Sequence, residues 1–175
     1  MLKYALLGML AKQSHHGYEL KARFEAAMGG TWPLNIGQIY STLSRLERDG
    51  LVEVEGVVPQ KAAPDRHVYS LTPAGAEALA QWIAEPSTEG VVLKDEMFVR
   101  ALVCAFVPGS DPLQAVRQQR VAAFRILNEL GELRADAESD ITRLLLDGAM
   151  LHVEADVQWL DNWEQHIRAN GPPRA

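Results

Sequence analysis

Polar side chains recur on one face of the stretch from Asn35 to Gly50. The apolar residues of this stretch recur every three or four positions: Ile36, Ile39, Leu43 and Leu46. This periodicity predicts a helix with one apolar stripe. At about 100° per residue, the opposite face carries Gln38, Ser41, Arg45 and Arg48. Glutamine, serine and arginine side chains bind base edges and phosphates, so this face is suited to contact DNA.

The segments before this stretch predict how the polar face is positioned. A first helix is expected over residues 2–12 and a second over 18–28, with a break at residues 14–17. Asn35 is a good N-cap for the third helix, with Gln38 three residues on as in a capping box. Gly50 is placed to end that helix. Two helices, a short turn and a third helix with a polar outer face form a helix-turn-helix.

Two strands are predicted after the third helix. Residues 51–58 are rich in valine and residues 66–71 read as a return strand, whereas residues 59–65 contain two prolines and cannot pair regularly. The hairpin tip carries Lys61, with Arg66 and His67 at its base. This hairpin is the wing of a winged helix.

The second half of the chain is helical in pattern. Thr72 and Pro73 begin a helix that ends before Pro86, and residues 86–90 form a polar linker. Helices are then expected over about 94–106, 112–135 and 138–169, the last two as an antiparallel hairpin. The expected domains are therefore a winged-helix DNA-binding domain (1–86), a helical dimerisation domain that could also bind an effector (91–170) and a disordered tail (171–175). The fold class is mainly α with a small β wing.

The last predicted helix is apolar on two neighbouring stripes. The first stripe follows a heptad spacing through Leu146, Met150, Val153, Val157 and Leu160. The second comprises Leu145, Ala149, His152, Asp156, Trp159 and Trp163. The preceding long helix can cover one stripe, and a second subunit is the natural cover for the other. The chain is therefore expected to form a homodimer.

Composition excludes several classes of protein. The net charge is −6, yet residues 1–86 carry eight Lys or Arg against nine Asp or Glu, so the acidity lies mostly in the second half. No apolar run approaches the about 18 residues that a membrane span needs. The single cysteine, Cys104, excludes an internal disulfide framework. No catalytic set, cofactor motif or metal-ligand run is visible. We expect a cytoplasmic protein that is not an enzyme and has no membrane partner.

Three ordered motifs resemble the PadR family of bacterial transcriptional regulators. They are S-H-H-G-Y-E-L, then I-G-Q-I-Y-S-T-L-S-R-L-E-R-D-G-L-V, then V-Y-S-L-T-P-A-G, and the likeness covers residues 4–80. The second half is similar, more loosely, to the helical carboxy-terminal region of the longer PadR-like subfamily. The resemblance implies paired winged helices held together by carboxy-terminal helices. It also implies repression of transcription, relieved in several members by a small aromatic or drug-like effector.

The resemblance and the residues together select the candidate DNA contacts. The family's helix tyrosine falls on Tyr40, the polar residue at the helix start on Gln38, and the basic wing residues on Lys61 and Arg66. Gln38 and Ser41 lie nearest the helix start, where residues reach base edges. The full set of candidates is Tyr18, Gln38, Tyr40, Ser41, Ser44, Arg45, Arg48, Lys61 and Arg66.

Several of these candidates have a second interpretation. Tyr18 and Tyr40 could pack in the core, contact phosphate, or do both. Arg48 stands beside Asp49, so a surface ion pair is about as well supported as a DNA contact. His15 and His16 lack a ligand partner at metal spacing, and a structural role at the turn is favoured for His16.

The second stripe of the last helix contains the candidate effector site. His152 and Asp156 stand in line with Trp159 and Trp163. The favoured interpretation is a dimer seam whose polar pair sets the register. The alternative is a ligand pocket with aromatic walls, to which the resemblance adds Trp32, the aromatic residue beside the turn.

Taken together, these features predict a homodimeric, sequence-specific DNA-binding regulator, a ligand-responsive repressor on a palindromic operator. Two other classes stay in competition with it. One is a winged helix that binds proteins, and the other is a helical dimer that binds small molecules without specific DNA binding.

Overall fold

The computed structural model describes residues 1–59, 66–86, 96–107 and 109–171. Contacts between Cα atoms divide the chain into two compact units, Met1–Thr88 and Glu89–Ala175. The predicted wing tip with Lys61, most of the predicted linker and residues 172–175 of the predicted tail lie outside the described residues. Among the helices described, none combines the length and the apolar character required to cross a membrane.

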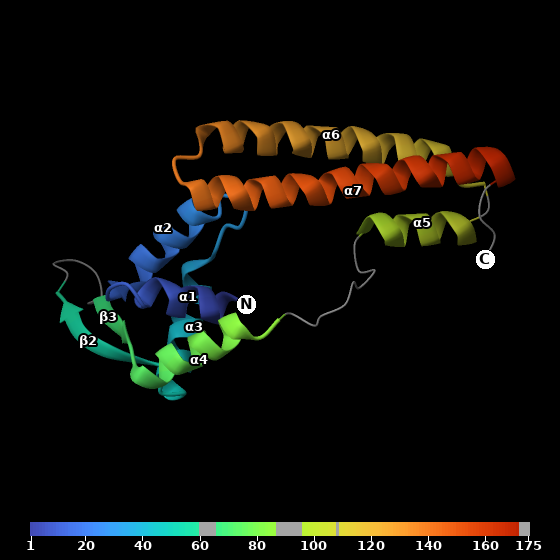
Figure 1. The fold of residues 1–175 in the computed structure, drawn as a ribbon. Coiled ribbons are helices and arrows are strands. Elements are labelled where there is room, and N and C mark those ends of the chain that lie inside the picture. Colours follow the sequence, from blue (N-terminus) through green and yellow to red (C-terminus); the bar gives the residue numbers. More distant parts are fainter. Residues whose placement is uncertain (60–65, 87–95, 108, 172–175) are drawn as a thin grey trace. The chain divides into compact units, whose positions relative to one another are not determined.

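The first unit packs four helices with a small antiparallel sheet (Figure 1). The helices are α1 (Leu2–Leu10), α2 (Gly17–Ala27), α3 (Ile36–Arg48) and α4 (Pro73–Ala84). The strands are β1 (His15–His16), β2 (Val52–Val58) and β3 (Arg66–Leu71), in the order β1-β3-β2. Three helices followed by a β-hairpin are the winged helix-turn-helix that the pattern predicts.

Strand β1 lies within the break between the first two helices that was predicted at residues 14–17, but the strand itself was not predicted. His15 lies opposite Tyr69 and His16 lies opposite Val68, so this short segment adds a third strand to the two-stranded wing. Two residues are too few to show an alternating pattern in the sequence. Their pairing depends on where α1 and α2 place the chain, which is a tertiary effect.

Apolar residues from the helices and the sheet form the core of the first unit. The stripe of α3 is inside, with Ile39, Leu43 and Leu46 buried and Ile36 packed at its edge. The other buried members are Leu6, Leu7, Leu10, Leu20, Phe24, Leu34, Val52 and Tyr69. α3 is thus fixed by its inner face, and its outer face is left on the surface.

Helix α4 approaches the turn after α3 closely because residue 75 is glycine. Thr72 Oγ1 accepts from the Gly75 amide at 3.0 Å and donates to the Gly50 carbonyl at 2.7 Å. A Cβ atom on Gly75 would lie 2.0 Å from the Leu51 carbonyl oxygen. Gly50 itself has φ +71°, the left-handed conformation expected of the residue that ends α3.

The second unit is built from α5 (Glu96–Phe106), α6 (Pro112–Asp136) and α7 (Asp140–Asn170). α6 and α7 lie side by side as the predicted antiparallel hairpin (Figure 1), joined at residues 137–139. Arg120 of α6 bridges Asp161 and Glu164 of α7 at 2.6 Å each. Near the other end of the hairpin, Arg134 pairs with Asp147.

Helix α5 changes the interpretation of the second stripe on α7. Met97 of α5 shares a buried cluster with Trp163, and Phe98 contacts Trp159 edge to face at 4.8 Å between ring centroids. The carboxy-terminal end of this stripe is therefore covered by the same chain, whereas a second subunit was predicted to cover all of it. In the remainder, Leu145 and His152 are exposed, and Ala149 and Asp156 are half-buried.

Candidate nucleic-acid interface

The outer face of α3 carries the polar residues that the sequence pattern places there. The exposed polar residues are Gln38, Ser41, Ser44, Arg45 and Arg48. The apolar stripe behind them is buried. A helix whose inner face is locked in a core and whose outer face is polar can enter the major groove as a rigid unit.

Hydrogen bonds at the start of α3 orient Gln38. Asn35 Oδ1 accepts from the Gly37 amide at 2.8 Å, and Gln38 Oε1 accepts from the Asn35 amide at 2.9 Å. Since a backbone N–H can only donate, the side-chain oxygen of Gln38 must face the cap. Its NH2 group points away and has no partner among the described residues. Gln38 therefore presents donors, which match acceptors such as guanine O6 and N7 or adenine N7.

Two arginines on this face are in different electrostatic situations. Arg45 Nε donates to the Ser41 carbonyl at 3.2 Å, and no carboxylate pairs with Arg45 within the described part of the chain. Arg48 Nε lies 3.2 Å from Asp49 Oδ1, and both side chains are more than half exposed. Arg45 keeps its full charge for an anionic ligand, whereas the charge of Arg48 is offset by its neighbour.

An aromatic cluster flanks α3 on the side of the wing. Tyr18 of α2 contacts Tyr40 of α3 edge to face at 6.2 Å, and the Arg66 guanidinium of β3 lies 5.0 Å from the centre of the Tyr18 ring. A Cβ on Gly17 would lie 2.8 Å from Tyr40, so only glycine allows this approach. The cluster ties the base of the wing to both helices of the helix-turn-helix.

The Tyr40 hydroxyl is protonated near neutral pH, as expected for a phenol with an ordinary pKa of 10.0. The surrounding protein raises the pKa of Tyr40 above its ordinary value, Tyr18 adds to the effect, and Arg66 opposes it. A protonated phenol can donate a hydrogen bond to a phosphate oxygen, so Tyr40 can pack and bind at once.

A histidine capping box, missed from the sequence, builds the start of α2. His16 Nδ1 accepts from the Glu19 amide at 3.2 Å, and the Glu19 carboxylate accepts from the His16 amide at 3.1 Å. These bonds hold the pKa of Glu19 below its ordinary value. The H-x-x-E spacing could have shown it, but histidine is not among the preferred capping residues. His16 has the structural role expected of it, and the described residues contain no group of three potential metal ligands.

The candidate effector residues are only partly brought together. Trp159 and Trp163 are neighbours at 5.3 Å between ring centroids, but Trp163 is buried. Phe98, which sequence reasoning did not select, joins Trp159 in lining a cavity of about 390 Å³ with Val99 and Leu102. Asp156 is half-buried on α7.

The other two candidates lie apart from this aromatic pair. His152 is exposed and stands seven residues before Trp159, about 10 Å along the helix axis. Trp32 belongs to the first unit, where its ring contacts Phe24 at 5.2 Å. A single pocket holding all five candidates is not seen within either unit.

A winged helix-turn-helix with an exposed polar third helix defines a class of transcriptional regulators, and comparison with known proteins assigns the family. Residues 6–81 match the transcriptional regulator PadR-like family. The probable transcriptional regulator Rv1176c of Mycobacterium tuberculosis is 30% identical, covering 91% of this chain and 94% of its own. The chain belongs to the PadR-like family, as its motifs predicted.

Solved structures share the fold over nearly the whole chain. Bacillus subtilis PadR in complex with operator DNA has a TM-score of 0.74 at 24% identity, covering 92% of this chain and 95% of that one. The same protein in complex with p-coumaric acid has a TM-score of 0.71, also at 24% identity and with the same coverage. PadR is described as a negative transcriptional regulator, and its sequence is 30% identical over 58% of this chain and 55% of its own. The likeness extends through the helical second unit as well as the winged helix.

Proposed function

We propose that this regulator binds operator DNA as a homodimer and represses transcription. The observation that carries the proposal is the exposed polar face of α3, locked from behind by the core and flanked by the Tyr18–Tyr40–Arg66 cluster. The crystal structure of Bacillus subtilis PadR with operator DNA supports the same use of this fold. Half-sites would lie about 10 base pairs apart, so that two α3 helices enter successive major grooves.

Each candidate side chain takes a role that its geometry allows. Gln38 and Ser41, near the start of α3, contact base edges, and Arg45 contacts a base or the backbone. Tyr18 and Tyr40 donate to phosphates beside α3, and Arg66 holds the wing in place over the backbone. Ser44 and Arg48 lie at the margin of the contact. Lys61, outside the described residues, is proposed as a phosphate contact of the wing tip.

The helical second unit is proposed to form the dimer. Large apolar side chains stand exposed on one face of α7; this α7 stripe is Ile141, Leu144, Leu145 and Leu151. Spacings of three, four and seven residues among them place these side chains on one face of the helix. Two copies related by a two-fold axis would cover each other's stripe, with His152 as the polar residue that sets the register.

A small aromatic effector is proposed as the signal, by analogy with the complex of Bacillus subtilis PadR with p-coumaric acid. In this chain the Phe98–Trp159 cavity supplies apolar and aromatic walls for such a ligand. The ligand would release DNA only if it binds one spacing of the two α3 helices more tightly than the other.

A salt titration tests the DNA-binding part of the proposal. Operator fragments would be selected from random duplexes, and affinity measured by fluorescence anisotropy between about 50 and about 200 mM salt. We expect a steep fall in affinity with salt, because each phosphate contact releases counterions. Arg45→Ala should weaken binding by about 1–3 kcal/mol, and Arg125→Ala on the exposed surface of α6 should not.

Two results would reject the proposal in favour of the competing classes. Binding that is absent, or insensitive both to salt and to Arg45→Ala, would favour a protein-binding winged helix. Aromatic ligands that bind without changing DNA affinity would favour a sequestering protein. Release of DNA by ligands that leave the fluorescence of Trp159 and Trp163 unchanged would place the effector elsewhere.

A further inference from the structure

A groove of about 400 Å³ runs beside α3 on the side opposite the wing. The first residues of the chain form one wall and α3 forms the other; its lining residues are Met1, Leu2, Lys3, Gln38, Thr42, Arg45, Leu46 and Asp49. Figure 1 shows α1 beside α3, and the two helices are in contact. The groove therefore joins the start of α1 to residues already proposed to contact DNA.

The two flanks of α3 differ in what they face. At about 100° per residue, Gln38, Thr42 and Arg45 lie on the flank lined by this groove, whereas Tyr40 lies on the other flank. The Tyr40 flank meets Tyr18 and, through it, Arg66. A helix lying in a major groove has a phosphate backbone on each side. Tyr18 and Tyr40, the proposed phosphate donors, lie on the Tyr40 flank, whereas on the groove flank Arg45 is proposed to contact a base or the backbone.

Lys3 supplies a positive charge on the flank of α3 that the groove lines. Its side chain is exposed, and its Nζ atom lies 4.5 Å from the centre of the Tyr4 ring. Tyr4 in turn stacks on Trp82 at 4.6 Å, which fixes the ring beneath the ammonium group. No carboxylate forms an ion pair with Lys3 in the described ranges. An ammonium held by a ring face, with its outer side open, can bind an anion without breaking an ion pair.

The charges of α3 itself make such a contact consequential. Asp49 offsets Arg48, and Glu47 is a further acid on the helix, so Arg45 is the free cation of the described part of α3. The affinity of a protein for the DNA backbone grows with the number of phosphates that it neutralises. A lysine from outside α3 therefore contributes a large fraction of the charge available to one protomer.

We propose that Lys3 binds a backbone phosphate of the operator on the flank of α3 opposite the wing. The protomer then holds the duplex from both sides, with Arg66 and the wing on one strand and Lys3 on the other. This inference rests on the proposed binding of DNA by α3. The contact carries no base specificity, because it is made to phosphate.

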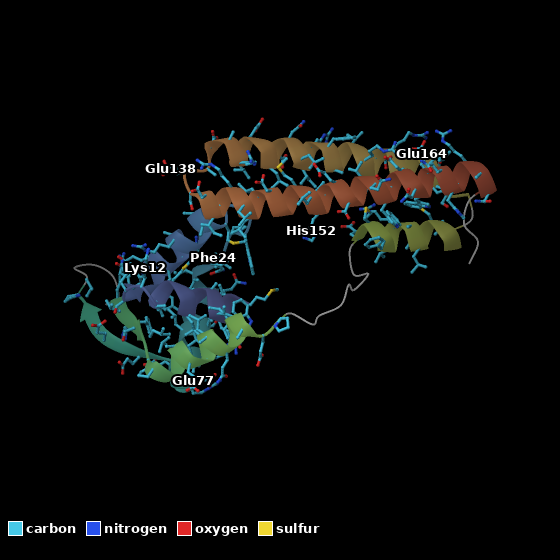
Figure 2. The ribbon with its side chains drawn as sticks, in the orientation of Figure 1. Lys12, Phe24, Glu77, Glu138, His152 and Glu164 are labelled. Atoms are coloured by element: carbon cyan, nitrogen blue, oxygen red, sulfur yellow. The ribbon has the colours of Figure 1, made fainter. Side chains whose placement is uncertain are left out.

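The test compares three variants by salt titration on the operator and on an unrelated duplex. Lys3→Gln should lower the slope of log affinity against log salt by about one on both duplexes. The ratio of the affinity of the unmodified protein to that of Lys3→Gln should therefore fall about threefold between about 50 and about 200 mM salt. Lys3→Arg should restore the slope. Lys12→Gln, two residues beyond the end of α1 (labelled in Figure 2), should leave the slope unchanged.

The slope separates this role from a structural one. If Lys3 acts only through the Tyr4–Trp82 stack, Lys3→Gln would weaken binding equally at every salt concentration and leave the slope intact, which would overturn the proposal. An unchanged slope for Lys3→Gln, together with a strong effect of Arg45→Ala, would also overturn the proposed role of Lys3. It would leave the proposed DNA-binding function intact. If the unmodified protein shows no salt-dependent binding, the proposed function has failed as well.

Discussion

The two units bury their apolar residues to different extents. In the first unit, four helices and three strands enclose a continuous core to which α1, α2, α3 and the sheet all contribute. In the second, α6 and α7 are long and paired, yet twelve large apolar side chains of the described residues remain exposed, against seven in the first unit. Isolated exposed apolar residues are common, but a line of them along one helix marks a protein contact.

This difference indicates that the two units have different roles. The first unit has enough layers to complete its core within one chain, so its outer surface is free to be polar and to bind DNA. The second unit is a hairpin with one short helix against one end, and apolar side chains on its remaining faces are exposed in the described part of this unit. We propose that a second copy of the chain covers these side chains. Four predictions test this contrast, beginning with the largest effect.

Charged substitutions on the α7 stripe should separate the protomers. Leu144→Glu combined with Leu151→Glu places two carboxylates in the proposed dimer contact. We expect a monomer by light scattering and a loss of operator affinity of at least about 100-fold, because the second half-site no longer adds to the first. Gln165→Glu, an exposed polar position on the same helix, is the control. A double variant that remains dimeric would show that the second unit associates through another face.

A methyl group at Gly17 should disturb the first unit where it meets DNA. The new Cβ would lie 2.8 Å from Tyr40, so Gly17→Ala must displace the tyrosine cluster. We expect a loss of about 1–3 kcal/mol of stability by thermal unfolding and at least about tenfold weaker operator binding. Gly8→Ala makes the same change on α1, where nothing lies within 4 Å of the new atom. It should preserve binding, and equal effects of the two variants would refute the role of the Tyr40 contact.

Acid should weaken the α6–α7 hairpin through Glu164. Arg168 and Arg120 lower the pKa of Glu164 below its ordinary value of 4.5. A group with a lowered folded-state pKa stabilises the fold above its unfolded value, and the contribution disappears as pH falls through the folded value. Glu164→Gln should therefore reduce the melting temperature near pH 7 and match the unmodified protein well below pH 4.5. Glu154→Gln, an exposed position, should track the unmodified protein at both pH values.

Removing Arg48 should have the smallest effect. Its pairing with Asp49 is exposed, and such pairs contribute at most about 1 kcal/mol. We expect Arg48→Ala to change stability by less than about 0.5 kcal/mol and operator affinity by less than about twofold. A decrease in affinity comparable with that of Arg45→Ala would show that Arg48 leaves Asp49 to contact DNA.

Much of the first unit could be predicted because its signals are local. The three-to-four spacing of apolar residues predicted α3 and its buried stripe, and Asn35 and Gly50 predicted both of its ends. Thr72 and Pro73 predicted the start of α4. These signals depend on residues within one or two turns, whose interactions hardly depend on the rest of the fold.

The parts that could not be predicted depend on distant residues. The pairing of His15 with Tyr69, the contact of Gly17 with Tyr40 and the covering of Trp159 by Phe98 each join segments far apart in the chain. The apolar pattern predicted two neighbouring stripes on α7, but periodicity does not show which element covers each stripe.

The amino-acid sequence by itself determined the order and type of the main elements, the polar outer face of α3 and the family to which the chain belongs. The tertiary structure was needed to show that Tyr18, Tyr40 and Arg66 form one cluster and that Lys3 stands beside α3. Periodicity and capping act over a few residues and are readable along the chain. Charge pairing and groove formation depend on side chains that meet through folding, so they become visible once the chain is packed.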